Sequence, residues 1–141
     1  MAVLRILFTR LRTEEKLLKE AAERLGIPCE LQLVSDTVFG GEPFCSQDDV
    51  VLARCVSHNQ NEAVAQMLET QGIRVVNSSH VMGVCGNKLT TSCVLEQAGV
   101  PQPKYLVAFT QEGALDAVER LGYPAVCKPV SGSWGRLLAK L

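Results

Sequence analysis

The stretch Pro124-Ala-Val-Cys-Lys-Pro-Val-Ser-Gly-Ser-Trp-Gly-Arg136 places a lysine at the end of an apolar run, directly before a glycine-rich loop. Lysine is seldom buried without a partner, so Lys128 at this point indicates a specific anion. Gly132 and Gly135 let backbone N–H groups approach that anion, because glycine has no Cβ atom. The stretch therefore predicts a buried strand followed by a loop that covers a nucleotide phosphate. Because the lysine precedes the glycines, the loop is neither a Walker A motif nor a Rossmann fingerprint.

Length and composition predict one globular domain, or one domain and part of another. The 141 residues are 47% hydrophobic, and 14 basic residues against 15 acidic ones leave a net charge of −1. This balance gives no reason to expect nucleic acid or an anionic membrane as a partner. No apolar run approaches the ~20 residues that span a bilayer. The first eight residues carry a charge inside their apolar run, which favours a strand over a signal peptide. We therefore expect a cytoplasmic protein.

The six cysteines favour reduced, mostly buried thiols over disulfides or a zinc site. They form no C-x-x-C pair, and four of the six lie in apolar strand or helix patterns. Cys127 neighbours Lys128 on the expected strand, so it should point to the opposite face and enter the core.

Helices that end at a glycine alternate with extended segments along the chain. This happens at Gly26, Gly72, Gly99 and Gly122, and proline follows three of them two residues later. Strands are expected at residues 3–8, 30–34, 50–53 and 74–76. The first helix should be capped by Thr13, and the second should span residues 59–71. The inward positions should be Leu17, Leu18, Ala21, Ala22 and Leu25 in the first helix, and Ala63, Val64, Met67 and Leu68 in the second. The pattern predicts an α/β domain with a doubly wound parallel sheet.

A second region is expected to begin with short helices at residues 79–85 and 87–98. It should continue through a strand at 105–109, a helix at 110–121, the strand that carries Lys128, and a strand that begins at Arg136. We expect two domains, 1–86 and 87–141, with the second cut off at its end.

Several segments together resemble one enzyme superfamily. They are Arg54-Cys-Val-Ser57, Arg74-Val-Val-Asn77, Gly86-Asn-Lys88, Gly99-Val-Pro-Gln-Pro103 and the Lys128 stretch. The chain resembles the ATP-grasp superfamily of carboxylate–amine ligases, in its RimK-like branch, and is most similar to LysX-type ligases of lysine biosynthesis. Lys-Pro followed by Gly-Ser-Trp-Gly-Arg is the most specific part of this resemblance.

The resemblance implies a fold and a reaction. Residues 1–86 would form a pre-ATP-grasp domain, and residues 87–141 the start of an incomplete ATP-grasp domain. The parent enzyme would be an ADP-forming carbon–nitrogen ligase that uses ATP and Mg²⁺. It would join 2-aminoadipate, or glutamate, to the C-terminal glutamate of a small acidic carrier protein (LysW) through an acyl phosphate. The metal ligands would lie beyond residue 141, and the sequence leaves open whether the protein is a homo-oligomer.

The resemblance also assigns binding residues. ATP would be bound by Lys88, Lys128, Ser131, Gly132, Ser133 and Gly135, and substrate by Arg54, Ser57 and Arg136. No catalytic residue and no metal ligand is assigned. Trp134 is interpreted either as a packing anchor or as a substrate contact.

Roles without a ligand stay open for three of these residues, and one position differs from the ATP-grasp relatives. Lys128 could extend its ammonium group into water, Lys88 could be a surface residue, and Arg136 could form a surface ion pair. Position 87 is commonly aspartate in these relatives, whereas this chain has Asn87, which could change how Lys88 is held.

Two other classes of protein also stay open. One is a non-catalytic nucleotide-binding fragment, and the other is a RimK-like ligase that adds glutamate to a protein or peptide. The acidic residues after Lys88 all fall in expected helices: Glu96, Glu112, Asp116 and Glu119. We therefore expect residues 1–141 alone to be inactive in ligation.

Overall fold

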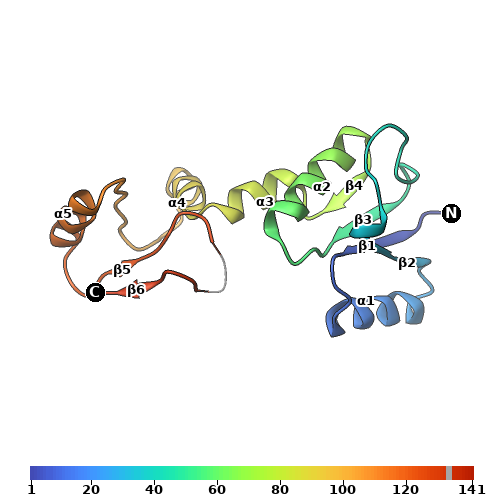
Figure 1. Cartoon of the computed structure of the whole chain (residues 1–141), viewed down its shortest axis with the longest axis horizontal. Coiled ribbons are helices and arrows are strands. Elements are labelled where there is room, and N and C mark those ends of the chain that lie inside the picture. The colour runs from blue at the N-terminus through green and yellow to red at the C-terminus, as the bar shows by residue number, and fades with distance from the viewer. Residues whose placement is uncertain (133–134) are drawn as a thin grey trace. The chain divides into compact units, whose positions relative to one another are not determined.

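The computed structural model describes residues 1–132 and 135–141, and the chain forms two compact units. Figure 1 shows their elements in order along the chain. The first unit is Met1–Gly83 and the second is Val84–Leu141. The helix α3 (Ser79–Gly86) contains the point at which the units divide.

The first unit is built on a four-stranded parallel sheet with the strand order β2-β1-β3-β4. Its strands are β1 (Leu4–Phe8), β2 (Cys29–Leu33), β3 (Val50–Ala53) and β4 (Arg74–Val76). All four predicted strands are present, within one residue of the expected bounds. The α/β class and the parallel sheet predicted from the sequence are confirmed.

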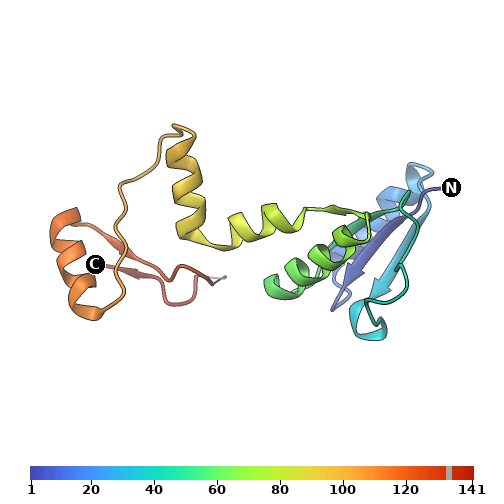
Figure 2. The same ribbon diagram turned by 90° about the horizontal axis from the view of Figure 1, so that it is seen from above.

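Two helices cover opposite faces of this sheet, as Figures 1 and 2 show. Helix α1 (Thr13–Arg24) connects β1 to β2, and α2 (His58–Thr70) connects β3 to β4. Because the two crossovers start near the middle of the sheet and run outward in opposite directions, right-handed connections place their helices on opposite faces. The link from β2 to β3 contains only the short 3-10 helix η1 (Val34–Asp36). The sheet is therefore doubly wound.

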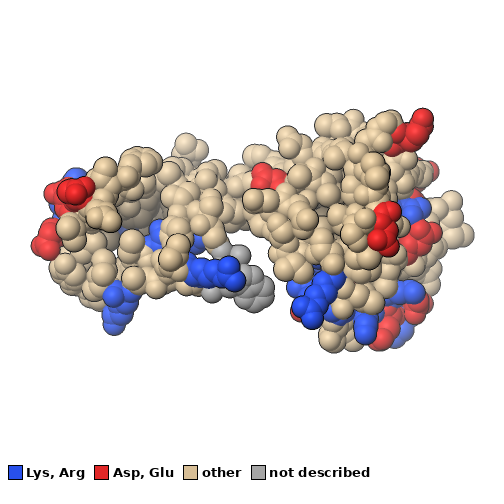
Figure 3. All heavy atoms as spheres, viewed as in Figure 1, with Lys and Arg blue, Asp and Glu red and all other residues tan. Residues whose placement is uncertain are grey.

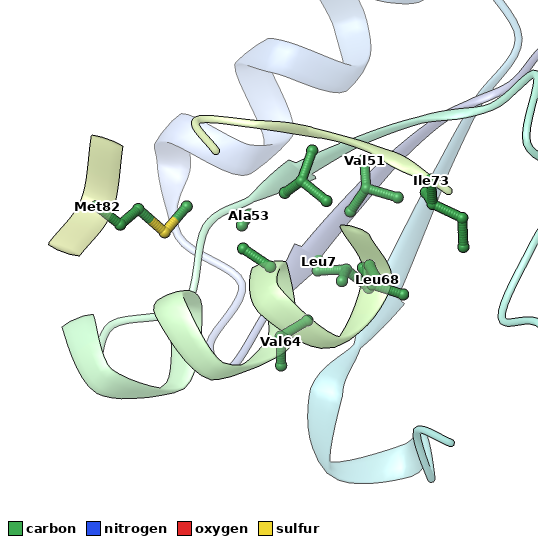
Figure 4. Packing of buried hydrophobic residues seen from close by; sticks show 9 residues of the cluster. Leu7, Val51, Ala53, Val64, Leu68, Ile73 and Met82 are labelled. Carbon is green, nitrogen blue, oxygen red and sulfur yellow. The ribbon is translucent and has the colours of Figure 1, made fainter. Parts of the chain in front are cut away.

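The main core lies between this sheet and α2 (Figure 4). Leu7 of β1 and Val51 of β3 are fully buried against Leu68 of α2, and Met82 of α3 closes the cluster. Val64 and Leu68 are buried as predicted, whereas Ala65 takes the inward position expected for Ala63.

The buried stripe predicted for α1 is largely wrong. Leu17 and Leu25 are 54% and 74% exposed, and the buried residues of the helix are Glu15 and Ala22. These two lie seven residues apart on one stripe of the helix, and Leu17 falls outside that stripe. The predicted Thr13 cap is also wrong, because Arg12 occupies the N-cap position and Thr13 is the first helical residue.

The second unit contains α4 (Lys88–Gln97), α5 (Gln111–Leu121) and a short antiparallel pair, β5 (Val126–Cys127) with β6 (Ala139–Lys140). The strand expected at residues 105–109 is not formed. Within the described part of this unit no neighbouring strand pairs with that segment, and an extended segment becomes a strand only when a neighbour takes its backbone hydrogen bonds.

The β5–β6 pair is exposed. The predictions of a buried strand before Lys128, of Cys127 in the core and of mostly buried cysteines are therefore wrong. Val126 is 55% exposed, Lys128 is exposed, and Cys127 is exposed instead of buried in the core. A two-stranded ribbon has too little apolar surface around it to bury either face. All six cysteines are free, as predicted, but only Cys55 is buried.

The expected glycine helix ends are all found. Gly26, Gly72, Gly99 and Gly122 each have φ between +68° and +87°, the left-handed region that ends a helix at low cost in glycine. In the described residues, no helix is long and apolar enough to cross a bilayer.

Candidate functional site

Lys88 stands at the start of α4, where Asn87 fixes the helix end. The side-chain oxygen Oδ1 of Asn87 accepts a hydrogen bond from the N–H of Thr90 at 3.0 Å, so Asn87 is the N-cap. Asparagine and aspartate are equally good in that role. The departure at position 87 thus leaves the helix start, and with it the backbone of Lys88, well anchored.

The loop that follows β5 is attached to this helix start. Asn87 and Ser131 form an isolated antiparallel bridge, and the Lys88 N–H donates to the Val130 carbonyl at 2.9 Å. The Lys88 amine Nζ donates to the Gly132 carbonyl at 2.8 Å. Three residues predicted to bind nucleotide, Lys88, Ser131 and Gly132, are therefore brought together from positions more than forty residues apart.

The glycines of the loop are required by its backbone. Gly132 has φ of +140° and Gly135 has φ of +67°, values that side-chain-bearing residues rarely adopt. Two sequence predictions at this point, Ser133 as a nucleotide contact and Trp134 as an anchor or substrate contact, lie outside the described residues.

Lys128 and Arg136 flank the loop and are both exposed. Among the described residues, neither side chain makes a hydrogen bond or an ion pair with protein groups. Together with Lys88 they supply three cationic side chains on or beside one glycine-containing loop. Cations and exposed loop backbone are what a phosphate group requires.

Three of the four acidic residues of the second unit have other partners. Glu96 accepts a hydrogen bond from the Tyr105 hydroxyl at 2.8 Å, Asp116 pairs with Arg120, and Glu119 accepts from the Tyr123 hydroxyl. Within residues 1–132 and 135–141 no three His, Cys, Asp or Glu side chains are grouped to hold a metal ion. The described residues therefore fit a phosphate but do not fit a magnesium site.

The first unit places Arg54 and Ser57 just after β3, at the carboxyl end of the sheet. Arg54 Nε donates to Glu15 Oε1 at 3.2 Å. Ser57 is the N-cap of α2, and its Oγ accepts from the Gln60 N–H at 3.4 Å. The two predicted substrate-binding residues thus lie on one short loop, with Arg54 held by an ion pair and Ser57 by a helix end.

Glu15, in the first turn of α1, is the centre of this arrangement. Its side chain is fully buried and accepts from Arg12 Nη2 at 2.7 Å, Arg12 Nε at 3.2 Å and the Arg12 backbone N–H at 3.0 Å. The hydrogen bonds from Arg12, with that from Arg54, lower the pKa of Glu15 to about 2. A glutamate at the third helical position is a known capping signal. No sequence pattern near Glu15 predicts its hydrogen bond with Arg54.

Comparisons with known proteins agree with this fold. The LysX preATP-grasp domain family matches residues 4–84. The α-aminoadipate–LysW ligase LysX of Saccharolobus solfataricus is 36% identical over 131 residues, which is 92% of this chain and 48% of that protein. The glutamate–LysW ligase ArgX of Sulfurisphaera tokodaii is 35% identical over 128 residues, 91% of this chain and 45% of that protein.

A solved structure gives the same result. The crystal structure of a RimK domain ATP-grasp protein from Sphaerobacter thermophilus superimposes with a TM-score of 0.77 at 25% identity. The match covers 99% of this chain and 53% of the Sphaerobacter thermophilus chain. The fold is thus that of a pre-ATP-grasp α/β protein, and the chain belongs to the LysX preATP-grasp domain family. It spans about half the length of the curated relatives it matches.

Proposed function

We propose that the chain supplies the pre-ATP-grasp domain and the first phosphate-binding elements of an ATP-dependent, ADP-forming carbon–nitrogen ligase. The ligase joins 2-aminoadipate or glutamate to the C-terminal glutamate of a LysW-type carrier protein in lysine or arginine biosynthesis. The similarity to relatives named as LysW ligases, over more than nine-tenths of this chain, is the observation that carries the proposal.

The attachment of the glycine loop to the start of α4 supports ATP as the nucleotide. Lys88 is the first residue of α4, where the helix dipole disfavours a cation unless an anion or a carbonyl group lies nearby. In this structure the Gly132 carbonyl accepts a hydrogen bond from the amine of Lys88. A phosphate oxygen is a stronger acceptor than a carbonyl, so Lys88 would turn to bound ATP.

Lys128, Ser131, Ser133 and Gly135 complete the proposed nucleotide site, and Arg136 is proposed to bind substrate next to it. The role of these residues is to position and to neutralise the phosphates. Bound ATP would supply the phosphoryl group that activates the carrier carboxylate for attack by the amine. The described residues offer no group of side chains that could hold magnesium.

Arg54 and Ser57 are proposed to lie on the substrate side of the reaction. They follow β3 at the carboxyl end of a parallel sheet, which is where ligands bind in open α/β folds. A carboxylate of the amino acid or of the carrier tail matches the guanidinium group of Arg54.

The proposal is tested with the protein expressed from its own gene, incubated with ATP, Mg²⁺, LysW-type carrier protein and either 2-aminoadipate or glutamate. The expected products are ADP and a carrier whose mass rises by one amino-acid residue. If no ADP forms with either amino acid and the carrier mass stays unchanged, the proposal is contradicted.

The likeness to a RimK domain protein keeps a second candidate, a ligase that adds glutamate to another protein or peptide. The same assay decides between the two when peptides ending in glutamate replace the carrier. Modification of such peptides in preference to the carrier would favour this second candidate.

A further inference from the structure

Glu15 joins two loops at the carboxyl end of the first unit's sheet. The loop after β1 carries Arg12, and the loop after β3 carries Arg54. Both guanidinium groups donate to the same carboxylate oxygen, Glu15 Oε1, at 2.7 and 3.2 Å. A separate hydrogen bond, from the Val56 N–H to the Thr9 Oγ1 at 3.0 Å, ties the same two loops together.

Two acidic side chains face the two arginines, because Arg12 Nε also lies 3.9 Å from a carboxylate oxygen of the exposed Glu14. The Glu15 carboxylate is fully buried, whereas the side chains of Arg12 and Arg54 are 30% and 35% exposed. Glu15 engages two of the five N–H donors of Arg12 and one of those of Arg54. Within the described residues the other donors of Arg54 bond to no protein group. The carboxylate therefore holds two guanidinium groups at one oxygen, while most of their donors make no hydrogen bond within the described residues.

A purely structural role would not need both arginines. The Arg12 contacts alone give Glu15 three hydrogen bonds, which satisfies a buried carboxylate. Arg54 adds one more at the cost of placing a second cation beside the first. Glu15 lies between the two cations and offsets part of their repulsion, while Arg54 keeps N–H donors that Glu15 does not use. Figure 3 shows Lys and Arg side chains on one side of the first unit, with Asp and Glu side chains among them.

We propose that Arg12 and Arg54, positioned by Glu15, form a binding subsite for a carboxylate group. Paired guanidinium forks that are fixed in advance match the planar, two-oxygen shape of a carboxylate. The inference rests on the proposed ligase function for the source of that carboxylate, which is either an acidic peptide tail or a free amino acid. It does not depend on nucleotide binding by the second unit.

The subsite is tested by NMR on the full 141-residue chain without ATP, through the Nε–Hε signals of Arg12 and Arg54. Three probes are titrated: a short acidic peptide ending in glutamate, the same peptide with an amidated C-terminus, and free L-glutamate. Saturable shifts of both signals with the free-acid peptide, at least threefold weaker with the amide, identify a peptide tail. Saturation with L-glutamate at equal or lower concentration identifies a free amino acid. Shifts with none of the probes overturn the proposal.

Variants separate the subsite from general charge attraction. Arg54→Ala should weaken binding of the effective probe about tenfold, because Arg12 still satisfies Glu15 and the fold is kept. Arg24→Ala removes the same charge from the other end of α1 and should change binding less than twofold. Equal losses in the two variants overturn the proposal.

Arg54→Lys keeps the charge without the fork, and should still lose at least threefold. Wild-type affinity in Arg54→Lys also contradicts the subsite. Thermal unfolding of each variant confirms that the comparison is made between folded proteins. Should Arg54→Ala fail to fold, Arg54→Lys alone decides the outcome.

Discussion

The amine of Lys88 donates a 2.8 Å hydrogen bond to the carbonyl oxygen of Gly132, a residue 44 positions later in the chain. The contact joins the first turn of α4 to the loop that follows β5. The backbone bond from Lys88 to Val130 and the bridge between Asn87 and Ser131 lie beside it. The side chain and the backbone of this helix start are thus both attached to the loop.

The first prediction concerns this contact. Lys88→Met should leave the two backbone links intact but release the loop carbonyl. Hydrogen exchange of peptides covering residues 126–132 should become about two- to fivefold faster, the scale of one solvent-exposed hydrogen bond. Lys104→Met, which removes an exposed lysine of the same unit, is the matched control. Identical exchange in the two variants would show that the amine does not hold the loop.

The second prediction concerns Glu15 and pH. Its pKa of about 2 in the folded chain lies below its ordinary value of 4.5, so its stabilising contribution is complete above pH 4.5. That contribution is lost as the pH falls from 4.5 towards 2. Glu15→Gln should lower the free energy of unfolding at pH 7 by about 1–3 kcal/mol, because charged hydrogen bonds are lost.

Urea denaturation of both proteins at pH 7 and pH 3 checks this prediction. The difference between wild type and Glu15→Gln should shrink at pH 3. A difference that stays constant with pH would mean that the charge of Glu15 contributes nothing.

The third prediction concerns a helix end. Gly26 has φ of +68° and open space where a Cβ atom would be placed. Gly26→Ala should therefore destabilise the fold by about 1 kcal/mol, through backbone conformation alone. Gly26→Asn should cost clearly less, because asparagine tolerates the left-handed region. Thermal unfolding of the two variants measures the difference, and equal losses would point to some other cause.

The fourth prediction concerns the thiols. Cys85 and Cys127 are exposed, whereas Cys55 is buried and burial raises its pKa. Alkylation at neutral pH followed by mass mapping should label the two exposed cysteines first and Cys55 last. Without a reducing agent, the unfolded protein should react at all six cysteines. Fewer than six would reveal a disulfide.

Much of the fold could be predicted because its signals are local. The glycines at positions 26, 72, 99 and 122 mark helix ends through a backbone preference of one residue. Short apolar runs such as residues 50–53 mark strands in the same way. The segment at residues 105–109 failed because a strand depends on a neighbour, which no local pattern reports.

Part of the candidate site could likewise be predicted from the sequence, and part could not. Lys88, Lys128 and the loop glycines could be selected from the sequence because residue type, order and resemblance agree. The importance of Glu15 could not be predicted, because its partner Arg54 lies 39 residues away and only the folded sheet brings them together. The exposure of Leu17 and Cys127 was missed for a related reason: an apolar pattern shows which residues could be buried, but burial also requires another surface to pack against.

The most direct test of the nucleotide site is an NMR titration of the chain with ATP, in wild type and in Lys128→Ala. We expect shifts concentrated at the amides of Lys88, Ser131, Gly132 and Gly135. We also expect an affinity about tenfold or more weaker in the variant, the scale of a charge-assisted hydrogen bond. Lys128→Arg should not restore full affinity, because a planar fork does not replace a compact ammonium group. Unchanged ATP affinity in a folded Lys128→Ala protein, or shifts confined to other parts of the chain, would contradict the phosphate-binding role of this loop.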